Sequence, residues 1–529
     1  MNTSSAGRRG RRILRRQGIS RRLQAGSATL VGMSLLLLCG CLTSPRQWVI
    51  QGFKVGPEHR PPAAPTAKRW IDAQTSAVDD GDSIRGTWWT VFNDPVLDAL
   101  IDTASQQNLN LREAGARILQ ARSRLAIARG SLFPQTQQMF GSMTRTQMSQ
   151  TTAKPVKVPF YDDWMTGFNA SWELDFWGRF QRGVEASKAD LGAAIEDCRD
   201  TLVVLQGEVA AAYIQTRIAQ ERIELAKQNI QLQEETLALA ELRFRDGKTT
   251  KLDVTQSQQN LATTRALVPQ LEIALRESQN ALCVLLSVPP YDLATELGSA
   301  PIPTPPTQVV VGIPAQLLTR RPDIRRAERL VAAQSARIGI AESDLYPRIA
   351  ITGTIGYESR NLSSLFQGDS FTGSIGPGFR WNILNYGRIF SNVRAEEARF
   401  QELVFNYQNL VIKAHEEVET GIARFLREQE RAAFLQQGVA AASESVTLAE
   451  SQYRIGKVDF QRLVDSQRGL VVLQDQLTAS RGLIATNLVA VYKALGGGWQ
   501  ATTATAFTAE TGGIPQSETE QLPQAAPLP

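Results

Sequence analysis

The sequence offers few residues that could carry out chemistry. Only two histidines occur, His59 and His415. His415 begins the run His-Glu-Glu-Val-Glu, which starts like a zinc-protease helix but lacks the second histidine that would complete the pair of ligands. Glycines at 373, 376 and 378 lie in a strand-like pattern and not between a strand and a helix, where a nucleotide-binding loop needs them. We therefore predict no catalytic residue, no metal site and no cofactor, and expect a protein that is not an enzyme.

The amino terminus has the pattern of an export signal. Residues 1–40 hold eight arginines and no lysine, aspartate or glutamate. The apolar run at 31–38 is too short to cross a bilayer and is typical of a secretory signal peptide. Without the eight arginines the formal net charge falls from +5 to −3. The basic pI therefore gives no reason to expect nucleic acid as a partner.

One cysteine in this region has a predicted modification. Leu38-Cys39-Gly40-Cys41 resembles a bacterial lipobox, in which Cys41 becomes the first residue of the mature protein and its sulfur carries lipid. An ordinary signal peptide with incidental cysteines is the alternative. The other cysteines, Cys198 and Cys283, would lie ~20 Å apart on antiparallel helices, which is too far for a disulfide. We expect both to be buried thiols.

Long helices dominate the predicted structure. Residues 177–259 recur at 386–468 with a constant offset of 209. Apolar residues repeat every three and four positions along 202–244 and at the corresponding places in the second copy, which predicts coiled coils. A helix over about 178–245 would be roughly 100 Å long. Gly247 and Gly456 end the long helices, and helices over about 251–286 and 460–495 run back.

Further segments complete the expected organisation. A helical segment is expected over 94–131, and two proline-rich stretches serve as leader and linker. The segments in chain order are a lipoprotein signal peptide (1–40), an extended lipid-anchored leader (41–85), the first repeat (86–290), a linker (291–310), the second repeat (311–499) and a disordered tail (500–529).

Each repeat also contains strands with period-two alternation. Large apolar side chains alternate with small or polar ones over 164–174, 349–357 and 371–381. The first of these segments is expected to pair with a strand before the connecting loop at 149–161, which gives four strands in all. Four strands are too few for a membrane barrel, and an open sheet in lipid would leave its edge amides unpaired. Copies of the chain would therefore have to join, and three copies would supply twelve strands. A soluble sandwich is the alternative, but it does not explain the lipobox and the long helices together.

Short motifs add a family resemblance. They are VGP at 55–57, WTVFNDP at 89–95, ARILQAR at 116–122, LFP at 132–134 with LYP at 345–347, and LLTRRPDIR at 317–325. In these motifs the chain resembles the TolC-like bacterial outer-membrane efflux proteins. The similarity is greatest to their NodT-like lipoprotein branch, which pairs with resistance-nodulation-division pumps, and covers nearly all of 41–499.

The resemblance implies a mainly α fold with a β-barrel portion and two internal repeats. In such a homotrimer, a 12-stranded transmembrane β-barrel crosses the outer membrane and a long α-helical coiled-coil barrel crosses the periplasm. It implies a passive conduit that exports small toxic compounds and is anchored to outer-membrane lipid. The implied partners are a periplasmic adaptor (membrane fusion protein) and an inner-membrane resistance-nodulation-division transporter.

The resemblance also places a gate at the two turns between long helices. The family's glycine followed six residues later by aspartate matches Gly247 and Asp253, whereas the second copy has Arg462 in this place and Asp465 three residues on. A threefold ring of carboxylates would favour cations, and Arg462 would form salt bridges that link neighbouring chains. The alternative is a solvated helix start, where acid is favourable. The candidate adaptor contacts are Gly247, Lys248, Thr249, Gly456, Lys457 and Val458.

Two rival functions remain open from the sequence. One is an outer-membrane duct of a type I protein secretion system, which would export proteins through the same fold. The other is a lipid-anchored periplasmic coiled-coil scaffold, which should lack strands with an apolar outer face.

Overall fold

A computed structural model describes residues 43–75, 78–79, 86–151 and 160–500. These residues form two compact units. The first unit contains residues up to Arg60, Ala126–Ala186 and Ala333–Phe400, and the second contains Pro61–Leu125, Ser187–Ala332 and the chain from Gln401 onward. Both units take segments from each half of the sequence. Within the described residues, the helices include none with the length and apolarity to span a bilayer.

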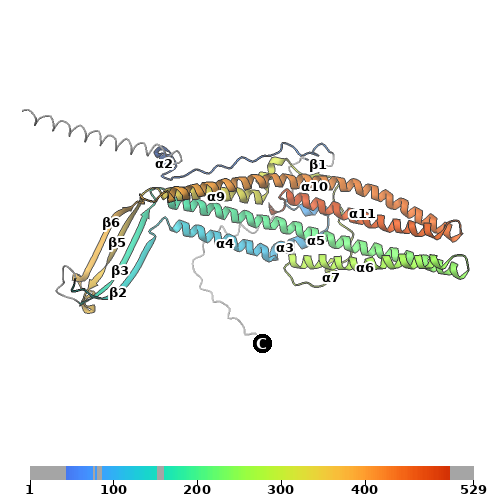
Figure 1. Ribbon diagram of the computed structural model, residues 1–529, viewed down its shortest axis with the longest axis horizontal. Coiled ribbons are helices and arrows are strands. Elements are labelled where there is room, and N and C mark those ends of the chain that lie inside the picture. The colour runs from blue at the N-terminus through green and yellow to red at the C-terminus, as the bar shows by residue number, and fades with distance from the viewer. Residues whose placement is uncertain (1–42, 76–77, 80–85, 152–159, 501–529) are drawn as a thin grey trace, which may run out of the picture. The chain divides into compact units, whose positions relative to one another are not determined.

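The first unit is built on a four-stranded antiparallel sheet (Figure 1). Its strands are β2 (Thr136–Gln147), β3 (Phe160–Leu174), β5 (Arg348–Ser359) and β6 (Phe371–Arg380), in the order β2-β3-β5-β6. The predicted strand segments in both repeats are confirmed. Among the described residues, β2 and β6 each pair on one side only, so both edges of the sheet are open.

The register separates an apolar face from a polar one. Directly opposed residues share a face of a sheet, and Met139, Phe168 and Ile355 are opposed in turn across three strands. The next row contains Gln138, Asn169, Thr354 and Ser374. Phe168 and Ile355 are each 56% exposed and Ile375 is 83% exposed. The apolar face is therefore open to its surroundings in the single chain.

The second unit contains two helical hairpins of equal size. Helix α5 (Arg179–Arg245) and helix α10 (Arg388–Arg454) have 67 residues each, and α6 (Lys251–Leu285) and α11 (Phe460–Ala494) have 35 each. The predicted helix ends are confirmed to within one residue. Helices α5 and α10 begin in the first unit and continue into the second.

The predicted apolar seam forms the contact between these helices. Along α5, Leu202, Leu205 and Val209 are buried, and along α10 Val411 and Val418 are buried. In the first copy the seam ends before its last predicted position, because Phe244 is 42% exposed, whereas the equivalent Tyr453 of the second copy is 2% exposed.

The helical segment expected over 94–131 is confirmed, but it is interrupted once. Two helices occur, α3 (Pro95–Gln107) and α4 (Leu109–Gly130), and Asn108 separates them. The buried Asn108 side chain donates a hydrogen bond to the Leu285 carbonyl (2.8 Å) and accepts one from the Leu111 amide (3.0 Å). It therefore caps the start of α4 and the end of α6 at once.

The leader is not wholly extended. Residues Pro45–Ile50 form α2, and Val55 and Gly56 are buried between α5 and α9 (Pro322–Ser343). Arg182 donates to the carbonyls of Val55 (2.9 Å) and Gly56 (3.1 Å). A Cβ added to Gly56 would lie 2.3 Å from the Gly339 Cα, so only glycine fits here. The VGP motif thus locks the leader into the first unit.

The remaining elements are short. Cys283 is buried as predicted, but Cys198 is only partly buried, and both are free thiols. The short elements are β1 (Val78–Asp79), η1 (Trp88–Phe92), α7 (Ala294–Leu297), β4 (Val309–Val310), η2 (Pro314–Gln316), α8 (Leu317–Arg320), η3 (Leu362–Ser364) and η4 (Gly368–Ser370).

Candidate functional site

Two turns at the ends of the hairpins form the candidate site. Helix α5 ends at Arg245 and helix α10 at Arg454, and a glycine with positive φ follows each (Gly247, +69°; Gly456, +76°). The amide of Lys248 donates to the Arg243 carbonyl (2.9 Å), and the amide of Lys457 donates to the Gln452 carbonyl (2.9 Å). These are the bonds of the glycine-terminated helix end. Both turns therefore have one backbone geometry, fixed by glycine.

An apolar cluster holds the two turns together. It takes residues from all four long helices of the second unit, so each hairpin buries its end against the other. Tyr453 is 2% exposed and its ring lies 5.3 Å from that of Phe460. Burial raises the pKa of the Tyr453 hydroxyl, which stays neutral. The buried members of the cluster are Ala240, Val254, Ala449, Tyr453, Phe460, Leu463 and Val464.

The side chain of Arg243 also joins the two hairpins at this cluster. Arg243, in the last turn of α5, donates a hydrogen bond to the carbonyl of Tyr453 on α10. Its guanidinium carbon also lies 4.5 Å from the centroid of the Tyr453 ring. A cation over an aromatic face is attracted by the ring quadrupole. Arg243 therefore makes two contacts to the same residue of the other hairpin.

A cleft of about 640 Å³ lies between the two turns. Asp253 lines it, but its carboxylate is not free: it accepts hydrogen bonds from the hydroxyls of Thr249 and Thr250 at the start of α6. Asp253 thus also stabilises the helix start. Five predicted adaptor contacts line the same cleft, namely Lys248, Thr249, Gly456, Lys457 and Val458, whereas Gly247 does not.

Arg462 and Asp465 lie on a different surface. They line a groove of about 520 Å³ along α10 and α11, with Ser445 and Gly469. Both residues are exposed. Asp465 accepts a hydrogen bond from Gln461 (2.9 Å) and lies 3.8 Å from Arg468. Within the described part of the chain, Arg462 has no carboxylate in ion-pair range, so its charge is available to another molecule.

A cluster of charged residues lies in another cleft of the second unit, of about 470 Å³. Buried Arg321 binds both oxygens of Asp323 (3.0 and 2.7 Å) and donates to Glu417 (2.6 Å) and to the Ala494 carbonyl at the end of α11 (2.9 Å). Burial and the nearby Asp323 carboxylate raise the pKa of Asp200 to about 6. The Arg321 of the LLTRRPDIR motif therefore ties α9, α10 and α11 together.

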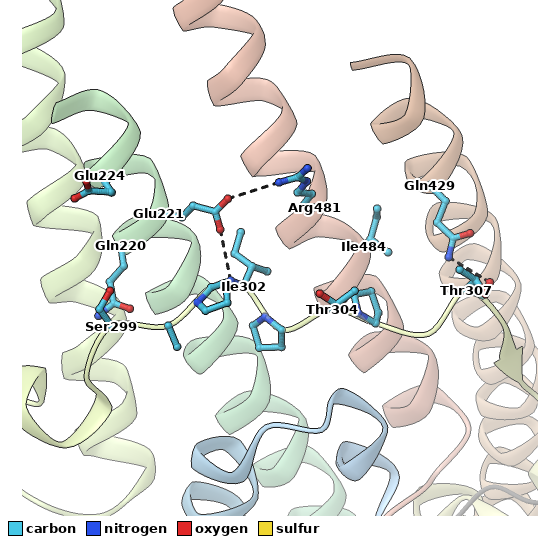
Figure 2. A pocket seen from close by; sticks show the side chains of 14 residues that line it. Gln220, Glu221, Glu224, Ser299, Ile302, Thr304, Thr307, Gln429, Arg481 and Ile484 are labelled. Atoms are coloured by element: carbon cyan, nitrogen blue, oxygen red, sulfur yellow. Dashed lines mark hydrogen bonds and ion pairs between the residues drawn. The ribbon is translucent and has the colours of Figure 1, made fainter. Parts of the chain in front are cut away.

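The proline-rich linker crosses three helices over a cavity of about 760 Å³ (Figure 2). Fully buried Arg217 on α5 fastens its start by donating to the carbonyls of Leu297 and Gly298 (both 2.8 Å). Glu221 lies between the Ile302 amide (3.5 Å) and Arg481 on α11 (4.0 Å), as Figure 2 shows. Gln429 on α10 donates to the Thr307 carbonyl at the far end (3.5 Å). The linker is thus attached to both hairpins.

Comparison with known proteins assigns the fold to a family. The profile of the family described as "Outer membrane efflux protein" matches residues 100–287 and 313–497. The chain belongs to the outer membrane efflux protein family. It is 30% identical to nodulation protein T of Rhizobium leguminosarum bv. trifolii over 431 residues, covering 81% of this chain and 91% of that protein. It is 29% identical to the pyoverdine export outer membrane protein OpmQ of Pseudomonas putida, covering 78% and 88% of the two chains.

Solved structures of outer-membrane channels have the same fold. The outer-membrane channel OprN is 32% identical, with a TM-score of 0.79 and coverage of 84% of this chain and 99% of that one. The structure of CusC gives a TM-score of 0.73 at 25% identity, with coverage of 84% and 99%. The NodT-like resemblance seen in the motifs is confirmed, and the chain is an outer membrane efflux channel.

Within this family fold, the predicted site residues divide into two groups. The cleft between the turns brings Asp253 together with most of the predicted adaptor contacts, whereas Arg462 and Asp465 lie in the groove beside α11. Cys41 lies outside the described residues. Sequence reasoning missed Arg243. A comparison of the repeats would have marked it, because the equivalent position in the second copy, 452, is glutamine.

Proposed function

We propose that this chain forms the outer-membrane channel of a tripartite efflux pump and acts as a passive trimeric conduit for small toxic compounds. The observation that carries the proposal is the four-stranded sheet with one apolar face and two open edges. Such a sheet is stable in hydrocarbon only when its edge amides are paired. Pairing β6 of one copy with β2 of the next satisfies both edges without another protein.

Three copies would close twelve strands into one barrel. The apolar row with Phe168 and Ile355 would then face lipid, and the row with Asn169 and Thr354 would line the pore. This arrangement favours a channel over a lipid-anchored scaffold, because a scaffold has no use for an apolar outer face. The proposed repeats, 86–290 and 311–499, each supply two strands and one hairpin, joined by the linker at 291–310.

The proposed location is the outer membrane, with Cys41 lipidated after removal of residues 1–40 and the leader starting there. The partners would be a periplasmic adaptor and an inner-membrane resistance-nodulation-division transporter. The relatives support a conduit that does not select its substrate, because OpmQ is named for pyoverdine export and CusC for cation efflux. Both are similar to this chain along most of their length. Selection would therefore lie with the transporter.

The two turns would be the periplasmic tip. The cleft between them, lined by Lys248, Thr249, Gly456, Lys457 and Val458, would receive the adaptor, and Gly247 would hold the turn that presents it. The exposed Arg462 and Asp465 would pair with neighbouring copies and, with Asp253, close the tunnel at rest. Both positions are exposed in the single chain, as an intersubunit contact requires.

The proposal is tested by the mass of the detergent-solubilised protein and by its conductance. Light scattering corrected for detergent should give three copies per particle, and the same particles should open pores in planar bilayers. A monodisperse single subunit that needs no detergent would contradict the proposal. A trimer without conductance would support the assembly and reject the channel.

A further inference from the structure

We propose that α2 and Phe53 form a second membrane contact, in which Val49, Ile50 and Phe53 enter the periplasmic leaflet of the outer membrane beside the sheet. We call Val49, Ile50 and Phe53, together with Trp48, the membrane foot. The inference rests on the proposed function for the orientation of the sheet in lipid. It goes beyond that function because it assigns a lipid-binding surface that is neither the barrel wall nor the acyl chain.

The foot exposes large apolar side chains on a short segment. Val49 is 55% exposed, Ile50 72% and Phe53 52%. A single exposed apolar residue is ordinary, but a contiguous group marks an interaction surface. Further along the leader the pattern changes, because Val55 and Gly56 are buried. The exposed apolar residues of this part of the leader therefore form one group at 49–53, and the next one, Ile71, lies eighteen residues further along.

The foot is fixed to the base of the sheet. The Trp48 indole donates to the Phe176 carbonyl (3.3 Å), and its ring lies 5.3 Å from Phe176 and 5.4 Å from Trp177. Phe53 lies edge-on to Trp48 at 4.8 Å. Trp177 in turn stacks on Tyr346 at 4.5 Å. Phe176 and Trp177 follow β3 directly, so the foot sits where the strands give way to helices.

Lipid is the occupant that this position favours. The apolar face of the sheet extends toward the foot through Trp172, which lies near the end of β3 and is 38% exposed. At the corresponding junction after β6, Ile383 and Leu384 are 70% and 82% exposed, and Tyr386, the counterpart of Trp177, is 93% exposed. Aromatic residues collect at the depth of lipid headgroups. Arg46, on the same helix as the foot, is exposed and can meet lipid phosphate.

Thr43, shortly before the foot, is held by three hydrogen bonds within the first unit. Its amide and hydroxyl donate to the Glu342 carboxylate (2.7 and 2.6 Å), and its hydroxyl accepts from the Gly56 amide (2.8 Å). Thr43 is therefore fixed two residues after the proposed lipid site. Stable anchoring of a peripheral segment takes two signals. The acyl chain and the foot would supply one each.

The test compares three single labels on full-length protein. A bimane fluorophore is placed on Ile50→Cys, on Ile375→Cys in the apolar face of the sheet, and on Arg60→Cys beyond the locked part of the leader. All three carry Cys198→Ala, which removes the partly exposed thiol. The protein is inserted into phosphatidylethanolamine–phosphatidylglycerol vesicles, and quenching by doxyl-labelled lipid is compared with quenching by aqueous iodide. Phe53→Cys repeats the measurement should Ile50→Cys assemble poorly.

The expected result is lipid quenching at Ile50 within about twofold of that at Ile375, with Arg60 quenched only by iodide. Iodide quenching alone at Ile50, beside normal lipid quenching at Ile375, would overturn the foot and leave the channel intact. Quenching by neither agent would place a second copy over the foot and also overturn it. Absence of lipid quenching at Ile375 would reject the proposed function and the foot together.

Discussion

Arg243 on α5 contacts Tyr453 on α10 between the ends of the two hairpins, through a hydrogen bond to the Tyr453 carbonyl and a guanidinium 4.5 Å from its ring. The two residues are separated by 210 positions in sequence. We expect the tip to open by a movement of one hairpin against the other, and this pair should resist that movement. The strength of the pair then sets part of the resting conductance.

Replacing Arg243 with alanine should raise resting conductance in planar bilayers. The loss combines a charge-assisted hydrogen bond and a cation–π contact and should be about 1.5–3 kcal/mol per copy. About 1.4 kcal/mol corresponds to tenfold in an equilibrium, so the open fraction should rise at least tenfold. Arg245→Ala is the matched control, because Arg245 is exposed and pairs only loosely with Glu241 (3.9 Å). Equal conductance of the two variants would reject the role of Arg243.

The double change Asp465→Ala with Arg462→Ala should raise resting conductance without destabilising the subunit. Both side chains are exposed, and such substitutions usually alter stability by less than about 0.5 kcal/mol. A conductance change would therefore come from contacts between copies. Single-channel recording gives the conductance, and thermal unfolding gives the stability. Unchanged resting conductance would count against the gate assignment of these residues.

Asp200→Asn should stabilise the protein at neutral pH and not in acid. Burial and the nearby Asp323 carboxylate raise the pKa of Asp200 from 3.8 to about 6, so the folded state prefers the protonated acid. The stability that this proton supplies is complete below pH 3.8 and is lost as the pH rises through about 6. Above that pH the ionised group costs on the order of 2–3 kcal/mol.

The measurement is the thermal midpoint of detergent-solubilised protein at pH 7.5 and at pH 4. The amide side chain of Asp200→Asn carries no charge, so the variant should exceed the wild type at pH 7.5 and match it at pH 4. Asp197→Asn is the control, because Asp197 pairs with Arg326 (3.1 Å) and its loss should lower the midpoint. A midpoint for Asp200→Asn that is shifted equally at both pH values would show that its effect is not one of ionisation.

Cys41→Ser should abolish acylation, because the thiol is the proposed site of lipid attachment. Growth with radiolabelled palmitate followed by gel autoradiography measures the incorporation. Cys39→Ser, two residues earlier, is the control and should keep the label on the mature protein. Label that persists in Cys41→Ser would place the anchor elsewhere in the chain.

The sequence predicted the long helices well because their signals are local and repeated. The seam from Leu202 recurs for some forty residues, and Gly247 and Gly456 each need a positive φ that few other residues tolerate. Strand β2 was harder to predict from the sequence. It is an edge strand with mostly polar residues on both faces, and its Met139 and Phe140 pair with different rows of the sheet. An edge strand takes its structure from its partner, which single-strand alternation does not reveal.

The parts that the sequence did not predict depend on distant partners. The apolar spacing of α3 continues into α4, and only the bond from Asn108 to Leu285, 177 residues away, shows why the helix stops between them. In the same way, the glycine–aspartate motif located Asp253, but not the hydroxyls of Thr249 and Thr250 that hold it. Arg243 was missed because its partner lies in the other repeat.

The seat of the leader has a consequence for the order of folding. Gly56 fits against Gly339, and Thr43 binds Glu342, so the pocket that accepts the start of the chain belongs to residues made almost three hundred positions later. Contacts so distant in sequence form late. The leader must therefore remain undocked until the second repeat has been synthesised and has folded. A docked leader then indicates that folding of the subunit is complete.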